Sequence, residues 1–146
     1  MNIIELEAGL PNGFHDATLE KLEIDYQKSV VYILMKLWIG LLPSKPFLGS
    51  TPVMRRANLS FERLVYCVVE PPEQLGDSDH EELDVSGCEN VPENPNVRLP
   101  TVAEGVFRYA FYVSDWNSFI HIAARTVGVT WLESEESAWS RAKEQD

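Results

Sequence analysis

FRYAFYVSDWNSFIHIAARTVGVTW, residues 107–131, is the stretch that decides the fold class. Apolar side chains take every second position from Phe107 to Val113, and the same spacing returns in residues 120–124 and 127–131. Alternation with a period of two is typical of half-buried β-strands. The segment 114–117, Ser-Asp-Trp-Asn, supplies turn residues between the first two runs. Three strands joined by short connections predict a β-meander and therefore an antiparallel sheet.

The same alternation appears in the first half of the chain. Apolar residues alternate with acids in 22–26, and a polar turn at Gln27-Lys28 leads into the strongly apolar segment 29–39. These two runs predict a hairpin whose second strand is central or covered, because both of its faces are apolar. Residues 59–69 predict a third long strand, in which Arg63 falls on the apolar face and indicates a bulge or a charged edge.

The tail from Ser134 is the one segment whose pattern predicts a helix. Ser134 is a suitable N-cap, and the tail is acidic at its start and basic towards its end, as the helix dipole favours. Trp139 gives this helix a narrow apolar stripe, which either docks on the sheet or closes a homodimer. Strands with short turns and a single helix predict an all-β (mainly β) fold: an antiparallel β-sandwich or a partly closed barrel with a short C-terminal helix.

Length and composition indicate one folded unit. The 146 residues can bury a substantial core, so residues 1–146 are expected to form a single domain. Charged residues make up 24% of the chain and apolar residues 45%, which excludes a chain that is disordered as a whole. The net charge of −11 argues against nucleic-acid binding, because contacts with phosphates need a basic face.

The compartment is predicted from what the sequence does not contain. The first residues, Met1 to Glu7, have no basic region followed by an apolar run, so a secretory signal is not expected. No apolar stretch reaches the roughly 20 residues that span a bilayer. Cys67 lies in a strand pattern and Cys88 in a polar segment, so two free thiols are a simpler expectation than a disulfide. We therefore expect a cytoplasmic protein with no membrane contact.

Most of the negative charge is concentrated in residues 70–100. This segment holds nine acidic residues, one basic residue and five of the nine prolines. Because its apolar residues show no period, it is expected to be an acidic loop inserted into the domain. Such a loop can attract a basic protein and speed association. The predicted binding residues are all carboxylates: Glu73, Asp77, Asp79, Glu81, Glu82 and Asp84.

The acidic loop does not match a metal site. Counted from Asp77, the sixth position is Glu82 where a calcium loop has Gly, and the twelfth is Cys88 where it has Glu. His80 and Cys88 lack the paired spacing of zinc ligands. No metal and no cofactor is therefore expected.

Three residues could carry acid–base chemistry. His15 and Asp16 follow the turn sequence Pro11-Asn12-Gly13, and His121 lies in a predicted strand. If the two histidines met across the sheet, they could form a metal site or an acid–base pair with Asp16. The more frequent outcome is that such histidines are structural, and no Gly-x-Ser-x-Gly motif supplies a nucleophile.

The box Leu-Pro-Asn-Gly-Phe-His-Asp-Ala at residues 10–17 resembles the opening of small, largely uncharacterised bacterial β-rich proteins. Many of these also end in a strand like Ile-His-Ile-Ala-Ala, residues 120–124. Some of them resemble immunity proteins, which neutralise toxins. The resemblance implies a bacterial, cytoplasmic, β-rich domain and transfers no catalytic residue.

Two functions follow from these observations. The first is a non-enzymatic protein-binding domain, of the immunity-inhibitor type, that holds a basic partner on its acidic surface. The alternative is a small metal-dependent hydrolase that uses His15, Asp16 and His121.

Overall fold

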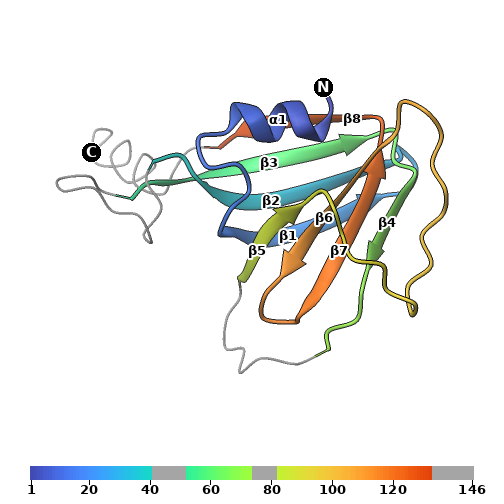
Figure 1. The fold of residues 1–146 in the computed structure, drawn as a ribbon. Coiled ribbons are helices and arrows are strands. Elements are labelled where there is room, and N and C mark those ends of the chain that lie inside the picture. The colour runs from blue at the N-terminus through green and yellow to red at the C-terminus, as the bar shows by residue number, and fades with distance from the viewer. Residues whose placement is uncertain (41–51, 74–81, 133–146) are drawn as a thin grey trace.

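A computed structural model describes residues 1–40, 52–73 and 82–132, which form one helix and eight strands (Figure 1). In chain order the elements are α1 (Ile3–Gly9), β1 (Ala17–Asp25), β2 (Val30–Trp38), β3 (Met54–Glu62), β4 (Tyr66–Val69), β5 (Leu83–Cys88), β6 (Phe107–Val113), β7 (Ser118–Ala124) and β8 (Thr126–Trp131).

All eight strands belong to one antiparallel sheet with the order β4-β7-β6-β5-β1-β2-β3-β8. The mainly β, antiparallel fold class is therefore confirmed. In place of the predicted β-sandwich or partly closed barrel, the structure has one open sheet with β4 and β8 at its two edges. It curls strongly, so that β6, β7 and β4 lie across β1, β2 and β3 (Figure 1). Phe61 of β3 and Phe111 of β6 consequently meet in the interior, with ring centroids 6.4 Å apart.

The side chains predicted to line the core are buried in β2, β6 and β7. The face of β2 formed by Val31, Ile33, Met35 and Leu37 is at most 1% exposed. Alternate residues of β6 and β7 are buried against it in the same cluster. Period-two alternation predicted these faces correctly because each of these strands has one side on a continuous core.

The predicted third strand is divided in two. β3 ends at Glu62, Arg63 takes a left-handed conformation with φ 52°, and β4 begins at Tyr66. Between them, the Leu64 amide donates to the Ser29 carbonyl at 2.9 Å, and the Val65 amide donates to the Ala123 carbonyl at 2.8 Å. Arg63 thus marks a corner where the chain leaves β3 and joins the opposite edge of the sheet beside β7. In place of the predicted bulge or charged edge, Arg63 lies at a corner between two strands, and the prediction of one continuous strand is wrong.

The prediction of a β-meander over residues 107–131 is wrong for the last strand. β6 and β7 form the expected hairpin, but β8 pairs with β3 and not with β7. Only Arg125 separates β7 from β8, and a hairpin needs a loop of at least two residues. The Arg125 amide donates to the Glu62 carbonyl at 3.2 Å, so the chain turns at the corner where β3 ends.

The segment 70–100 is not one irregular loop. Leu83–Cys88 form β5, which pairs with β1 on one side and β6 on the other. The strand was missed because its inner face carries only two large apolar side chains, the partly buried Leu83 and the buried Val85. The next inward position is Gly87, where an added Cβ would lie 1.8 Å from the Tyr109 hydroxyl.

The helix of the described residues is N-terminal. The Asn2 side chain accepts from the Glu5 amide and the Glu5 side chain accepts from the Asn2 amide, which completes a capping box. Ile3 and Leu6 bury one side of α1 against the core. The predicted C-terminal helix from Ser134 lies outside the described residues. The only helix within the described residues is too short to span a membrane.

Cys67 and Cys88 are free thiols, as predicted. They lie on β4 and β5, which β7 and β6 separate in the sheet. Burial raises the pKa of the Cys67 thiol to about 11.

Candidate functional site

Two exposed carboxylates, Glu73 and Asp84, and the partly buried Asp115 surround the β6–β7 turn at one end of the sheet. The Glu73 amide donates to the Trp116 carbonyl at 2.9 Å, and the Glu73 carboxylate accepts from the Asn117 amide group at 2.6 Å. On the other side of the turn, the Asp84 carbonyl accepts from the Ser114 amide at 3.1 Å. Asp115 lies within the turn itself. We call Glu73, Asp84 and Asp115 the acidic end.

Glu82 lies just before β5 and is partly neutralised. Its carboxylate is 2.9 Å from the Lys36 ammonium, and Glu20 lies 3.5 Å from the same nitrogen. The hydrogen bond with Glu82 raises the pKa of Lys36, an effect that burial partly opposes. The remaining predicted binding residues, Asp77, Asp79 and Glu81, lie outside the described residues.

His15 and Asp16 form a surface pair. Their side chains are 59% and 58% exposed, and the His15 Nε2 lies 3.7 Å from the Asp16 carboxylate. The preceding turn is structural, because the Asn12 side chain donates to the carbonyls of Trp38 and Gly40.

His121 pairs with Glu70 and not with His15. The His121 Nε2 lies 2.5 Å from the Glu70 carboxylate, and the two side chains are only 5% and 7% exposed. The Glu70 amide donates to the Phe119 carbonyl at 3.0 Å and the Glu70 carboxylate accepts from the Phe119 amide at 3.3 Å, which keeps the carboxylate beside the ring. Glu70 was assigned to the acidic loop, and 51 residues separate it from His121 in the chain, so no local pattern could reveal this pair.

The described residues bring no three His, Cys, Asp or Glu side chains together in a way that could hold a metal. His15, Asp16 and His121 are therefore not assembled into one centre.

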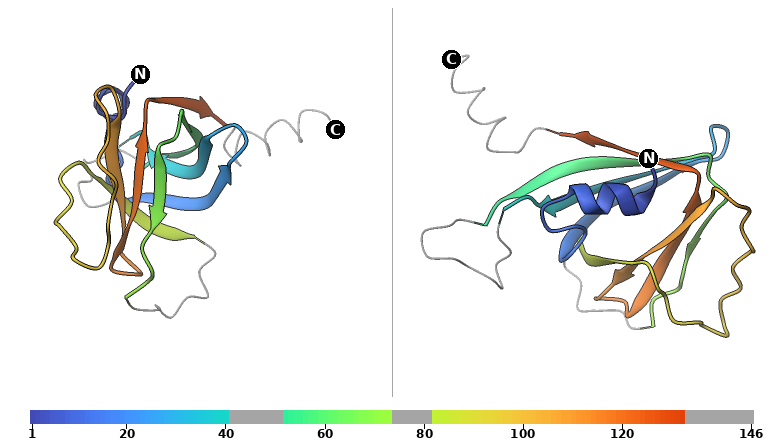
Figure 2. Two further views of the ribbon diagram at one scale, coloured as in Figure 1. Left: turned by 90° about the vertical axis from the view of Figure 1, so that its right-hand side faces the viewer. Right: turned by 45° about the horizontal axis from the view of Figure 1, so that its top comes forward.

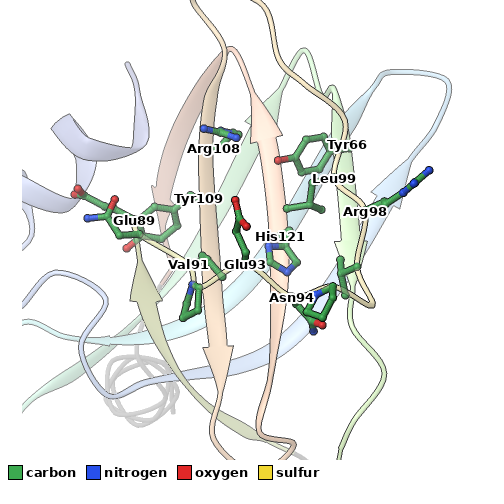
Figure 3. Close-up of a pocket in the computed structure, with 14 residues that line it drawn as sticks. Tyr66, Glu89, Val91, Glu93, Asn94, Arg98, Leu99, Arg108, Tyr109 and His121 are labelled. Atoms are coloured by element: carbon green, nitrogen blue, oxygen red, sulfur yellow. The ribbon is translucent and has the colours of Figure 1, made fainter.

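His121 lies in the floor of a cavity of about 730 Å³. The floor is the outer face of β4, β7 and β6, on which Tyr66, Ala123 and Arg108 form one cross-strand row. The segment 89–106, between β5 and β6, runs outside the sheet (Figure 2), and residues 89–99 form the roof of the cavity (Figure 3). We call this space the roofed pocket. Sequence patterns could not indicate it, because its residues come from three strands and a connection.

Comparison of the chain with protein-family models, with curated proteins and with solved structures found no match in any of the three sets. The resemblance of residues 10–17 to bacterial immunity-type proteins therefore stays a prediction.

Proposed function

We propose that this chain is a cytoplasmic, non-enzymatic binding protein of the immunity-inhibitor type, which holds a basic partner protein on its acidic end. The observation that carries the proposal is the gathering of Glu73, Asp84 and Asp115 around one turn. These residues are brought together from the segment after β4, from β5 and from the β6–β7 connection. No ion pair neutralises them among the described residues, whereas Glu82 is held by Lys36.

A cluster of carboxylates such as the acidic end mainly affects the rate at which the two proteins associate. Clustered charges of one sign raise the association rate with an oppositely charged partner by about 10-fold to 1,000-fold at low ionic strength. The effect falls as salt shortens the Debye length. Residues 74–81 carry three further carboxylates between Glu73 and Glu82 in the sequence and add to the charge of this region.

No observation in the described residues favours the alternative, a metal-dependent hydrolase. His15 and Asp16 are at the surface, and the Nε2 of His121 faces Glu70. The proposed homodimer through Trp139 stays a prediction, because that residue lies outside the described part of the chain.

The proposal is tested with two triple variants of equal net charge. One neutralises the acidic end (Glu73→Gln, Asp84→Asn, Asp115→Asn). The matched control neutralises three exposed carboxylates elsewhere: Glu23→Gln, Glu62→Gln and Glu104→Gln. A basic protein retained from a lysate of the source cell on the immobilised wild-type chain is purified and used as the probe.

Association rates are then measured by surface plasmon resonance across a salt series. We expect the acidic-end variant to associate roughly tenfold more slowly at low salt, with a flatter salt dependence, while the control stays close to wild type. Equal rates for the two variants would show that net charge, and not this end, drives binding, and would refute the proposal.

A further inference from the structure

We propose that the roofed pocket is a binding site for a small organic acid, with an apolar body and a single carboxylate. This inference is independent of the proposed function, because the pocket and the acidic end are formed by different residues. It is carried by three polar groups of the floor that lack protein partners and by the apolar lining of the roof.

The first polar group is the Tyr66 hydroxyl. Tyr66 is 8% exposed and lines the pocket, and within the described residues its hydroxyl has no hydrogen-bond partner. Burial raises the pKa of Tyr66, so the phenol keeps its proton and is available as a donor. The hydroxyl is not a fully buried orphan, because Ser118 Oγ is the one such side-chain atom in the described residues; it opens into the cavity and is free to donate to an acceptor on a ligand.

The second group is the Arg108 guanidinium, which stands beside Tyr66 on the other side of Ala123 in the same cross-strand row. Its positive charge lowers the pKa of Tyr66, an effect smaller than that of burial. Among the described residues no carboxylate pairs with Arg108. A guanidinium and a phenol that converge on one space are suited to a carboxylate oxygen.

The third group is the second ring nitrogen of His121. The Nε2 faces Glu70, while the Nδ1 has no hydrogen-bond partner in the described part of the chain. The ring is 95% buried and lines the pocket beside Glu93 of the roof (Figure 3). Glu70 fixes the orientation of this ring, so the Nδ1 is held in a constant position.

The roof provides an apolar surface and leaves space beneath it. Val91, Pro92, Val97 and Leu99 line the pocket from above. Where the structure describes the chain, no hydrogen bond joins residues 91–105 to β4, β6 or β7. The cavity volume of about 730 Å³ lies within the range of about 300–1,000 Å³ that is usual for small-molecule sites.

The charge of the rim selects a monoanion. Glu89 and Glu93 also line the pocket, and their carboxylates repel further negative charge. Arg98 lines it as well, but its guanidinium end points away from His121 and Arg108 (Figure 3). One carboxylate can be held by Arg108 and Tyr66, whereas a dianionic phosphate ester would meet stronger repulsion. The class of ligand is therefore an apolar monocarboxylic acid.

The test uses 1-naphthaleneacetate as the probe and two comparators of similar shape. 1-Naphthaleneacetamide is neutral, and 1-naphthyl phosphate is a dianion at pH 8. Affinities are measured by NMR titration of the full chain. We expect the acetate to bind about tenfold or more tightly than the amide, and more tightly than the phosphate. Binding should shift the ring signals of His121 and leave those of the surface residue His15 unchanged.

Three variants complete the test. Arg108→Gln should remove the preference for the acetate over the amide, and Tyr66→Phe should weaken acetate binding several-fold. Arg55→Gln makes the same charge change on β3, outside the pocket, and should behave as wild type. Thermal melts check that each variant is folded. Equal affinity for acetate and amide, an unchanged preference in Arg108→Gln, or no binding of any probe at millimolar concentration would overturn the proposal.

Discussion

Replacing Gly87 by alanine should destabilise the fold far more than a single methyl group suggests. An added Cβ would lie 1.8 Å from the Tyr109 hydroxyl oxygen, 2.8 Å from its Cζ and 3.1 Å from the Phe14 Cβ. The Tyr109 ring is held from three sides, by Phe14, by Phe111 and by a 2.8 Å hydrogen bond from its hydroxyl to the Glu7 carboxylate. The ring cannot move aside without losing that bond.

The magnitude is the sum of two costs. Overpacking of a core position costs about 1–3 kcal/mol, and a lost hydrogen bond to a charged group costs about 1.5–3 kcal/mol. We expect Gly87→Ala to lower the free energy of unfolding by about 2.5–6 kcal/mol. At about 2–4 °C per kcal/mol for a chain of this size, Tm should fall by roughly 10 °C.

A double-mutant cycle measured by urea unfolding isolates the clash. Tyr109→Phe removes the hydroxyl oxygen that the new Cβ would strike, so Gly87→Ala should cost about 1.5 kcal/mol less in that background. Gly9→Ala is the matched control, because an added Cβ there meets nothing within 4 Å. Additive effects of the two substitutions, or a Gly87→Ala variant as stable as Gly9→Ala, would refute the described packing of β5 against β6.

Two further predictions concern titratable groups. Burial raises the pKa of Cys67 to about 11 from an ordinary 9.0, so its thiolate fraction at pH 8 is about one hundredth of the ordinary fraction. Iodoacetamide should therefore label Cys67 in the folded Cys88→Ser variant about a hundredfold more slowly than in the unfolded chain. Similar labelling rates in both states would contradict the burial of Cys67. The pKa of Lys36 is raised in the folded state above 10.5, so its pairing with Glu82 contributes stability below pH 10.5 that is lost as pH rises through the folded value. Wild type should therefore exceed Lys36→Gln in stability by up to about 1 kcal/mol near pH 8 in urea unfolding and converge with it at strongly alkaline pH, whereas a gap that persists there would contradict the ion pair.

The strands with strong alternation could be predicted from the sequence, but their partners could not. Residues 29–39 and 107–124 carry enough alternating apolar side chains to identify both strand and inward face. Alternation is a property of one strand against one core and holds no information on which strand lies beside it. The pairing of β8 with β3 depends on the corner at Arg63 and Arg125. There the Val65 amide donates to the Ala123 carbonyl, and the Arg125 amide donates to the Glu62 carbonyl.

The candidate sites also contain some residues that the sequence could identify and others that it could not. Charge counts along the chain located two carboxylates of the acidic end, Glu73 and Asp84, since local composition is visible in one dimension. They missed Asp115, which lies outside residues 70–100 and joins the other two only in the folded chain. They also misplaced Glu70, because whether a carboxylate faces water or a buried imidazole depends on residues far along the chain.

By itself, the sequence determined the mainly β class, the inward faces of the long strands and the region of greatest negative charge, because all three follow from the order of neighbouring residues. Tertiary structure alone decided the strand order, the burial of Glu70 beside His121 and the meeting of Tyr66 with Arg108 beneath residues 89–99. Each of these results from contacts between distant segments, which the curl of the sheet and the corner at Arg63 bring together.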